Sequence, residues 1–145
     1  MIGKCLCGAV EFEVAGEMPN LYQCHCSLCR KTTGAAANAA TFIEQTHFEW
    51  LSGESSIRSY VKDSGFRSDF CGCCGSPVPN LLRDTGLYFL PVGLLEETKG
   101  FQVVQHLYTD SKAHWDVIGG SAEQHDEMPS LKALNEALQH SSSVS

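Results

Sequence analysis

The sequence has little positive charge and no long hydrophobic run. Its 145 residues include 10 Lys and Arg against 17 Asp and Glu, which gives a formal net charge of −7. An acidic surface repels phosphate groups, so this composition disfavours binding to nucleic acid or to an anionic membrane. No stretch offers the roughly 20 apolar residues that a transmembrane helix needs. We therefore expect no nucleic-acid partner and no membrane association.

The N-terminal segment also lacks the apolar core of a secretory signal peptide, and the first cysteine is already residue 5. We therefore expect a cytoplasmic protein. Internal repeats and linkers are absent too, which predicts a single domain over residues 1–139. The small, polar residues 140–145 are expected to form a flexible tail.

Cysteine is abundant, with eight in the chain. In a reducing compartment, so many cysteines in a short sequence indicate metal ligands rather than disulfides. The three groups are Cys5 and Cys7; Cys24, Cys26 and Cys29; and Cys71, Cys73 and Cys74.

Short alternating segments between turn signals predict a mainly β fold. In residues 9–14, Val10, Phe12 and Val14 alternate with two glutamates, which is typical of a half-buried strand. Further strands are expected near residues 37–43, 46–51, 57–61, 87–92 and 103–108. One helix is expected, in residues 130–140, where leucines recur at the helical period after a proline. Phe101 and Trp115 are interpreted as core residues.

Two of the cysteine groups combine into a complete tetrahedral site. Cys5 and Cys7 lie two residues apart at the start of a strand, so their side chains share a face. Cys71 and Cys74 form a Cys-x-x-Cys turn, and the following Gly75 can adopt the positive φ that such turns need. We assign these four cysteines to a structural zinc.

Cys24, Cys26 and Cys29 remain as a set of three sulfurs. A catalytic zinc keeps one of its four positions open for exchange, so this set predicts a catalytic zinc site.

The alternative is that a fourth side chain closes this second site. Cys73, His106 or His114 could supply that ligand; otherwise Cys73 is interpreted as a spare, buried thiol. His25 is less suited, because it lies between two cysteines of the set and should face the other way.

The cysteines stand in three longer strings, which read in order KCLCGAVEFEV, CHCSLCRKTTG and FCGCCGSPV. This pattern resembles the glutathione-dependent formaldehyde-activating enzyme family, whose domain is shared with centromere protein V. The resemblance covers roughly residues 4–118 and implies a β-tent fold of several small antiparallel sheets clamped by two zinc ions per chain. It matches the structural and catalytic ligand sets assigned above.

The resemblance also implies a carbon–sulfur lyase that converts glutathione and formaldehyde to S-hydroxymethylglutathione, with the substrate sulfur filling the open zinc position. Arg30 and Lys31 directly follow Cys29 and are candidates for contacts with the carboxylates of glutathione. Their alternative role is to cap a solvated turn.

Two functions therefore stay open. One is a zinc-dependent lyase that acts on an adduct of glutathione, or another thiol, with formaldehyde or a related small electrophile. The other is a non-catalytic zinc-binding scaffold or interaction module, as the centromere-protein branch suggests. A zinc-ribbon nucleic-acid binder would need a basic face that this composition does not offer.

Overall fold

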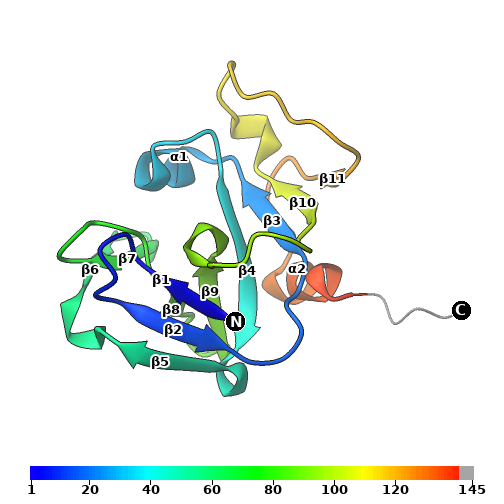
Figure 1. Cartoon of the computed structure of the whole chain (residues 1–145). Helices are drawn as coiled ribbons and strands as arrows, with labels where there is room; N and C mark the ends of the chain where they lie inside the picture. Colours follow the sequence, from blue (N-terminus) through cyan, green and yellow to red (C-terminus); the bar gives the residue numbers. More distant parts are fainter. Residues whose placement is uncertain (141–145) are drawn as a thin grey trace, which may run out of the picture. The chain divides into compact units, whose positions relative to one another are not determined.

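The computed structural model describes residues 1–140, which form short strands and two short α-helices (Figure 1). The helices are α1 (Ser27–Thr33) and α2 (Leu131–Leu138), with 3-10 turns at Gln45–His47, Glu54–Ser56, Val92–Leu94 and Thr109–Ser111. The strands are β1 (Ile2–Lys4), β2 (Glu11–Val14), β3 (Leu21–Cys24), β4 (Asn38–Glu44), β5 (Phe48–Ser52), β6 (Ile57–Val61), β7 (Arg67–Cys71), β8 (Asn80–Leu81), β9 (Leu87–Pro91), β10 (Val103–Leu107) and β11 (Glu123–Gln124). The predicted mainly β fold with a C-terminal helix is confirmed.

The chain divides into two compact units. The first contains Met1–Met18 and Phe42–Lys99, and the second contains Pro19–Thr41 and the chain from Gly100 onward. Within residues 1–140, no helix is long and apolar enough to cross a membrane. Of the predicted flexible tail, all but His140 lies outside the described residues.

In the first unit, β1, β2 and β5 form an antiparallel sheet. The predicted alternation holds in β2, where Phe12 and Val14 are buried while Glu13 is exposed. Phe12 lies opposite Trp50 of β5. The strands β6 and β7 pair separately as an antiparallel hairpin, and β8 pairs with β9.

Aromatic side chains supply part of the first unit's core. The rings of Phe48 and Tyr88 stack with their centroids 3.9 Å apart, and Trp50 meets Phe48 edge-on at 4.9 Å. The rings of Phe12 and Phe48 also stack, with their centroids 5.3 Å apart. Each such pair contributes about 0.5–1.5 kcal/mol beyond burial of its area.

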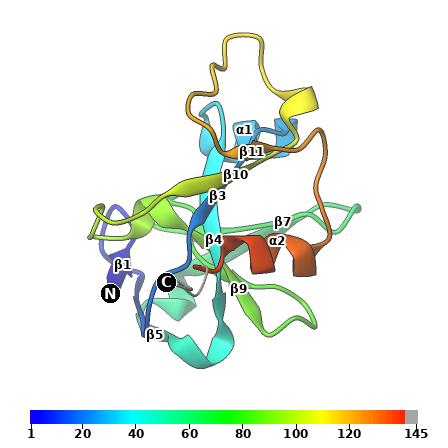
Figure 2. The same cartoon turned by 90° about the vertical axis from the view of Figure 1, so that its right-hand side faces the viewer.

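In the second unit, β3 lies between β4 and β10 (Figure 2). It is antiparallel to β4 but parallel to β10, and β10 is also parallel to β11. The sheets were expected to be antiparallel, and the two pairings of β10 differ from that expectation. No tight turn joins β3 to β10, so local sequence places no limit on their relative direction.

The helix α2 follows its predicted pattern. The hydroxyl of Ser130 accepts a hydrogen bond from the backbone N–H of Ala133 at 3.1 Å and so caps the first turn. Leu134 and Leu138 are fully buried. Figures 1 and 2 both show α2 close to β10, which it contacts.

The helix α1 was not predicted, because seven residues with one buried side chain show no apolar periodicity. Its N-cap is Cys26, whose Sγ accepts a hydrogen bond from the backbone N–H of Cys29 at 3.4 Å. The helix therefore depends on a cysteine in the place where serine, threonine or aspartate usually stands.

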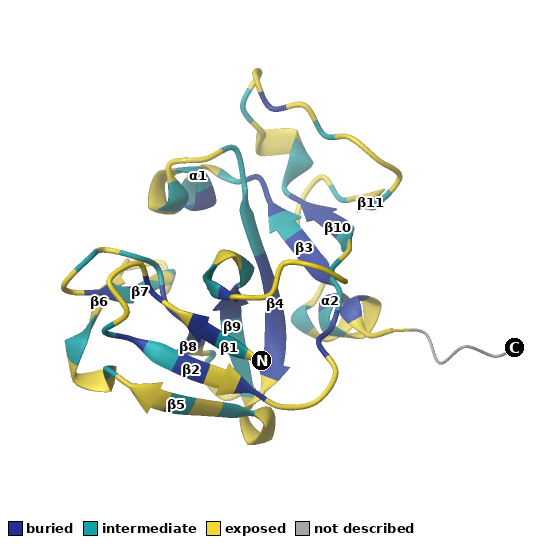
Figure 3. Cartoon of the chain, in the orientation of Figure 1, coloured by how far each residue is buried: buried dark blue, intermediate teal, exposed yellow. Residues whose placement is uncertain are grey.

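The segment between β10 and β11 is mostly exposed (Figure 3). Trp115 is 68% exposed and Val117 is 90% exposed, so the interpretation of Trp115 as a core residue is wrong. Phe101, before β10, is half-buried. Between the two exposed apolar residues, the carboxylate of Asp116 is buried.

Gly53 provides a test of the first unit's packing. It has φ +85°, and a Cβ atom there would lie 2.0 Å from the carbonyl oxygen of Ala9, which leads into β2. We expect Gly53→Ala to lower the free energy of unfolding by about 3 kcal/mol, because it combines left-handed strain with a backbone clash. Denaturant unfolding of the metal-loaded protein measures this change.

The matched control is Gly65→Ala. Gly65 has a similar φ of +94°, but a Cβ there would meet no atom within 4 Å. Strain alone should cost about 1 kcal/mol. Equal losses in the two variants would show that the close approach to Ala9 does not restrict residue 53.

Candidate functional site

Four cysteines of the first unit form one cluster. The ligand atoms of Cys5, Cys7, Cys71 and Cys74 all lie within 4.8 Å of one another. The Sγ atom of Cys7 is 3.7 Å from that of Cys5 and 3.9 Å from that of Cys71. Sulfurs held 2.3 Å from a tetrahedral zinc are about 3.8 Å apart. The cluster can therefore hold a metal ion, and its donor set fits zinc.

The turn after β7 presents two of these sulfurs. The backbone N–H of Gly75 donates to the carbonyl of Cys71 at 2.7 Å, and Gly75 has φ +80°, as the sequence predicts for a Cys-x-x-Cys turn. The hydroxyl of Ser76 lies 3.3 Å from the Sγ of Cys74. Hydrogen bonding to Ser76 lowers the pKa of Cys74 to about 5, which favours the thiolate that binds metal.

The remaining cysteine of this turn lies outside both clusters. Cys73 is exposed, so the prediction of a buried thiol is wrong. The cluster itself is backed by a small core, in which Val10 and Val78 are buried together with Cys5 and Cys71.

The second unit brings the other three cysteines together. Cys24 ends β3, Cys26 caps α1 and Cys29 lies in its first turn, and their sulfurs all lie within 4.8 Å of one another. The sulfurs of Cys24 and Cys26 are 3.4 Å apart. Cys24 and Cys29 are buried, whereas Cys26 is partly open to solvent. This arrangement leaves one side of the cluster accessible.

The three thiols have unequal acidity. Hydrogen bonds from Cys24 and then Cys29 lower the pKa of Cys26 to about 2, while the bond to Cys26 raises the pKa of Cys24 to about 11. Hydrogen bonding to its two neighbours, together with burial, raises the pKa of Cys29. One negative charge therefore concentrates on Cys26, the sulfur closest to solvent, before any metal binds.

Within residues 1–140, no fourth cysteine, histidine, aspartate or glutamate joins this three-cysteine cluster. The alternative ligands considered from the sequence, Cys73, His106 and His114, all lie outside it. His25 also stays outside, although it stands between two of the cysteines. The described residues thus supply three ligands and leave room for one more.

Every polar atom of His25 instead takes part in a hydrogen bond. Its Nδ1 lies 2.6 Å from Oδ2 of Asp116, and its Nε2 lies 2.9 Å from Nδ1 of His106. Its backbone N–H donates to Leu107 at 2.9 Å, and its carbonyl accepts from Nη1 of Arg30 at 3.1 Å. These bonds hold the peptide that joins two ligands of the three-cysteine cluster.

Arg30 and Lys31 occupy different environments. Nη1 of Arg30 also donates to the carbonyl of Ser111 at 2.7 Å, so Arg30 links α1 to the segment after β10. Lys31 is exposed in the last turn of α1. Lys31 is therefore free to meet a ligand, whereas Arg30 already has a structural role.

Sequence reasoning missed the role of Asp116. The carboxylate lies 91 residues from His25 and only 2.6 Å from its ring. A single aspartate in an irregular segment carries no local pattern, so only its burial between two exposed apolar residues reveals it.

Taken together, these features define a small, mainly β protein with two cysteine clusters that could each hold a metal ion, one of four cysteines and one of three. Residues 1–111 match the model of the family described as glutathione-dependent formaldehyde-activating enzyme. The chain belongs to this family. It is also similar to a Rhodobacter sphaeroides protein solved by structural genomics, with 26% identity and a TM-score of 0.56. That match covers 68% of this chain and 91% of the other.

The division of the cysteines predicts two different mutant behaviours. Cys71→Ser should cause unfolding or aggregation, because it removes a buried ligand that ties distant parts of the first unit. Cys26→Ser should leave a folded protein that retains about one zinc ion fewer per chain. Metal analysis with circular dichroism measures both effects. The same behaviour in both variants would contradict the division.

Asp116→Asn tests whether His25 steadies the three-cysteine cluster. The substitution keeps the side-chain shape but removes the charge facing His25, so we expect a chelator to strip metal from this cluster about tenfold faster. Release from the four-cysteine site should not change. The control is Asp110→Asn, an exposed position in the same segment. Equal rates of metal release in both variants would show that His25 does not steady the three-cysteine cluster.

Proposed function

We propose that this protein is a zinc-dependent carbon–sulfur lyase of the cytoplasm. It would act on the adduct of a thiol, with glutathione as the leading candidate, and formaldehyde or a related small electrophile. The reaction would resemble that of S-hydroxymethylglutathione synthase. Membership of the family supports this class of chemistry, and eight free cysteines suit a reducing compartment.

The observation that carries the proposal is the three-cysteine cluster. Its sulfurs converge as closely as those of the four-cysteine cluster, yet the described residues contribute only three ligands. A structural zinc site is closed by four protein ligands, whereas a catalytic site keeps a position for water or substrate. The difference between the two clusters matches this distinction.

The donor set fits zinc in both clusters, because thiolates favour this metal and the sulfur spacings suit its tetrahedral geometry. Cys5, Cys7, Cys71 and Cys74 would hold a structural ion. Cys24, Cys26 and Cys29 would hold the catalytic ion. When bound, that ion would supply a Lewis acid that lowers the pKa of a substrate thiol.

The protein's own groups would prepare the reaction. The backbone N–H of Cys29 and the neighbouring thiol of Cys24 hold Cys26 as a thiolate at the accessible side of the cluster. In the forward direction, a bond forms between the thiol sulfur and the carbonyl carbon, and the thiol proton ends on the carbonyl oxygen. The reverse direction breaks the same carbon–sulfur bond.

Positive charge near the cluster supports an anionic thiol such as glutathione. Lys31 extends into solvent from α1 two residues after Cys29 and can meet a carboxylate. Arg30 would contribute charge from a fixed position, because its Nη1 already donates to two carbonyls. We propose Lys31 as the more mobile contact of the two.

The proposal predicts that the zinc-loaded protein binds glutathione and that Cys26→Ser does not. It also predicts exchange between free and hydroxymethylated glutathione faster than in buffer alone. Calorimetry measures the binding, and NMR exchange spectroscopy measures the rate. Zinc bound at both clusters with neither thiol binding nor faster exchange would favour the non-catalytic scaffold.

Lys31→Glu tests the charge contribution separately. We expect about fivefold weaker glutathione binding, the size of one exposed ion pair. The control is Lys132→Glu, which reverses an exposed charge on α2 instead. Equal affinities in these two variants would remove Lys31 from the thiol site without affecting the role of the cysteines.

A further inference from the structure

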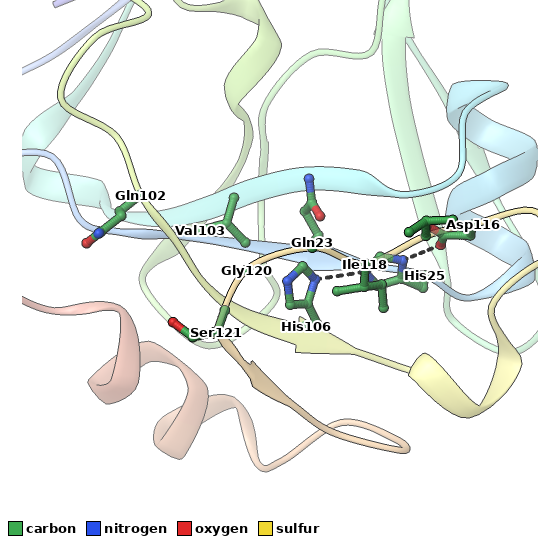
Figure 4. Close-up of a pocket in the computed structure, with 12 residues that line it drawn as sticks. Gln23, His25, Gln102, Val103, His106, Asp116, Ile118, Gly120 and Ser121 are labelled. Atoms are coloured by element: carbon green, nitrogen blue, oxygen red, sulfur yellow. Dashed lines mark hydrogen bonds and ion pairs between the residues drawn. The ribbon is translucent and has the colours of Figure 1, made fainter.

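A pocket of about 440 Å³ lies in the second unit beside β3 and β10, within the usual size range of sites for small molecules. Figure 4 shows Gln23, His25 and His106 at its wall, with Asp116 and the segment through Ser121 around them. Successive side chains of a strand point to opposite faces. Gln23 therefore faces the pocket while Cys24 faces the three-cysteine cluster, so the proposed lyase chemistry leaves this pocket unused.

Three buried side chains form a hydrogen-bonded chain that ends in the pocket. Asp116 is 7% exposed, His25 is 2% exposed and His106 is 5% exposed. Asp116 and His106 use both ring nitrogens of His25, at 2.6 and 2.9 Å. Nδ1 of His106 is thereby occupied, and its Nε2 has no hydrogen-bond partner among residues 1–140.

The free nitrogen faces open space. Within residues 1–140, no fully enclosed side-chain nitrogen or oxygen lacks a partner, so Nε2 of His106 is reached from the pocket that this ring lines. Figure 4 shows the ring with this nitrogen turned away from His25. Polar atoms in buried side chains are nearly always hydrogen-bonded, which makes Nε2 a contact point for a bound molecule.

The direction of the hydrogen bonds that join Asp116, His25 and His106 decides whether Nε2 of His106 donates or accepts. The carboxylate of Asp116 accepts from Nδ1–H of His25. When Nδ1–H of His106 donates to Nε2 of His25 across their 2.9 Å contact, Nε2 of His106 is left as an acceptor. Burial lowers the pKa of His106, which favours the neutral form of this ring. The pocket therefore offers an acceptor to an N–H or O–H group.

The charge of the lining excludes one class of ligand. The described residues that line the pocket include no lysine or arginine, and Asp116 is their one acidic residue. An anion would find no cation to pair with and would face this carboxylate. Glutathione, with two carboxylates, is therefore poorly suited to this pocket.

We propose that the pocket is a second binding site, for a small uncharged or cationic molecule that donates an N–H or O–H hydrogen bond to Nε2 of His106. The amide of Gln23 and the hydroxyl of Ser121 line the same space and can bind further polar groups of the ligand. Among residues 1–140, no cysteine lines the pocket, so a ligand bound there would contact neither cysteine cluster, and its binding can be tested apart from the lyase function.

Acetamide and acetate form a matched pair of probes. They have nearly the same shape, but acetamide is neutral and donates N–H, whereas acetate is an anion that only accepts. Titration of zinc-loaded protein, followed by NMR of the histidine ring nitrogens, should show saturable shifts of His106 with acetamide and none with acetate. Saturation by neither probe, or equally by both, would overturn the proposal.

His106→Asn sharpens the test. An asparagine amide can still donate to His25 from a position near that of Nδ1, but the group at Nε2 is lost. We expect at least about tenfold weaker acetamide binding with the fold and zinc content retained, as for loss of a buried hydrogen bond. Unchanged binding would show that Nε2 is not the contact.

Ser121→Phe provides a second route if the asparagine variant does not fold. Ser121 is exposed at the pocket's edge, so a larger side chain there can fill the space without touching the buried chain. The shifts that acetamide causes in the NMR signals of the His106 ring nitrogens should disappear, while the hydrogen bonds of His25 stay intact. Persistence of those shifts would place acetamide elsewhere and overturn the site.

Discussion

The convergence of cysteine sulfurs is the constraint on which this structure depends. Thiolates at close range repel one another, so such clusters are stable only when a cation offsets their charge. In the first unit, the sulfurs of Cys7 and Cys71 lie 3.9 Å apart although 64 residues separate them. A metal ion bound there would close a long loop of chain and so contribute to folding directly.

The two clusters are supported in different ways. Around the first, Cys5 and Cys71 are buried with two valines, so metal ligands and hydrophobic core are one structure. In the second cluster, all three cysteines come from one short segment, and Cys26 belongs to the cluster while it also caps α1. Its surroundings fix the intervening residue His25 through hydrogen bonds with Asp116, His106 and Arg30. A site held in this way can keep one side open.

His25 gives the segment between β3 and α1 two faces with different chemistry. Its neighbours Cys24 and Cys26 serve the three-cysteine cluster, while its ring continues the buried chain toward the pocket. Both faces share the same stretch of backbone, so a displacement of the His25 side would reach Cys24 and Cys26 through very few covalent bonds.

Patterns of spacing were sufficient to predict much of the fold and which cysteines form each of the two clusters. The alternation around Phe12, the leucines of α2 and the Cys-x-x-Cys turn all appear in the structure. Parallel pairing of β10, the helix α1 and the exposure of Trp115 were not predictable, because each depends on contacts between distant residues.

The sequence by itself therefore determined which cysteines group together and that the fold is mainly β, since both follow from short-range spacing. Only the tertiary structure decided that the three-cysteine cluster has no fourth ligand among the described residues. It alone also brought Asp116 to His25, because a hydrogen bond across 91 residues leaves no periodic trace in the sequence.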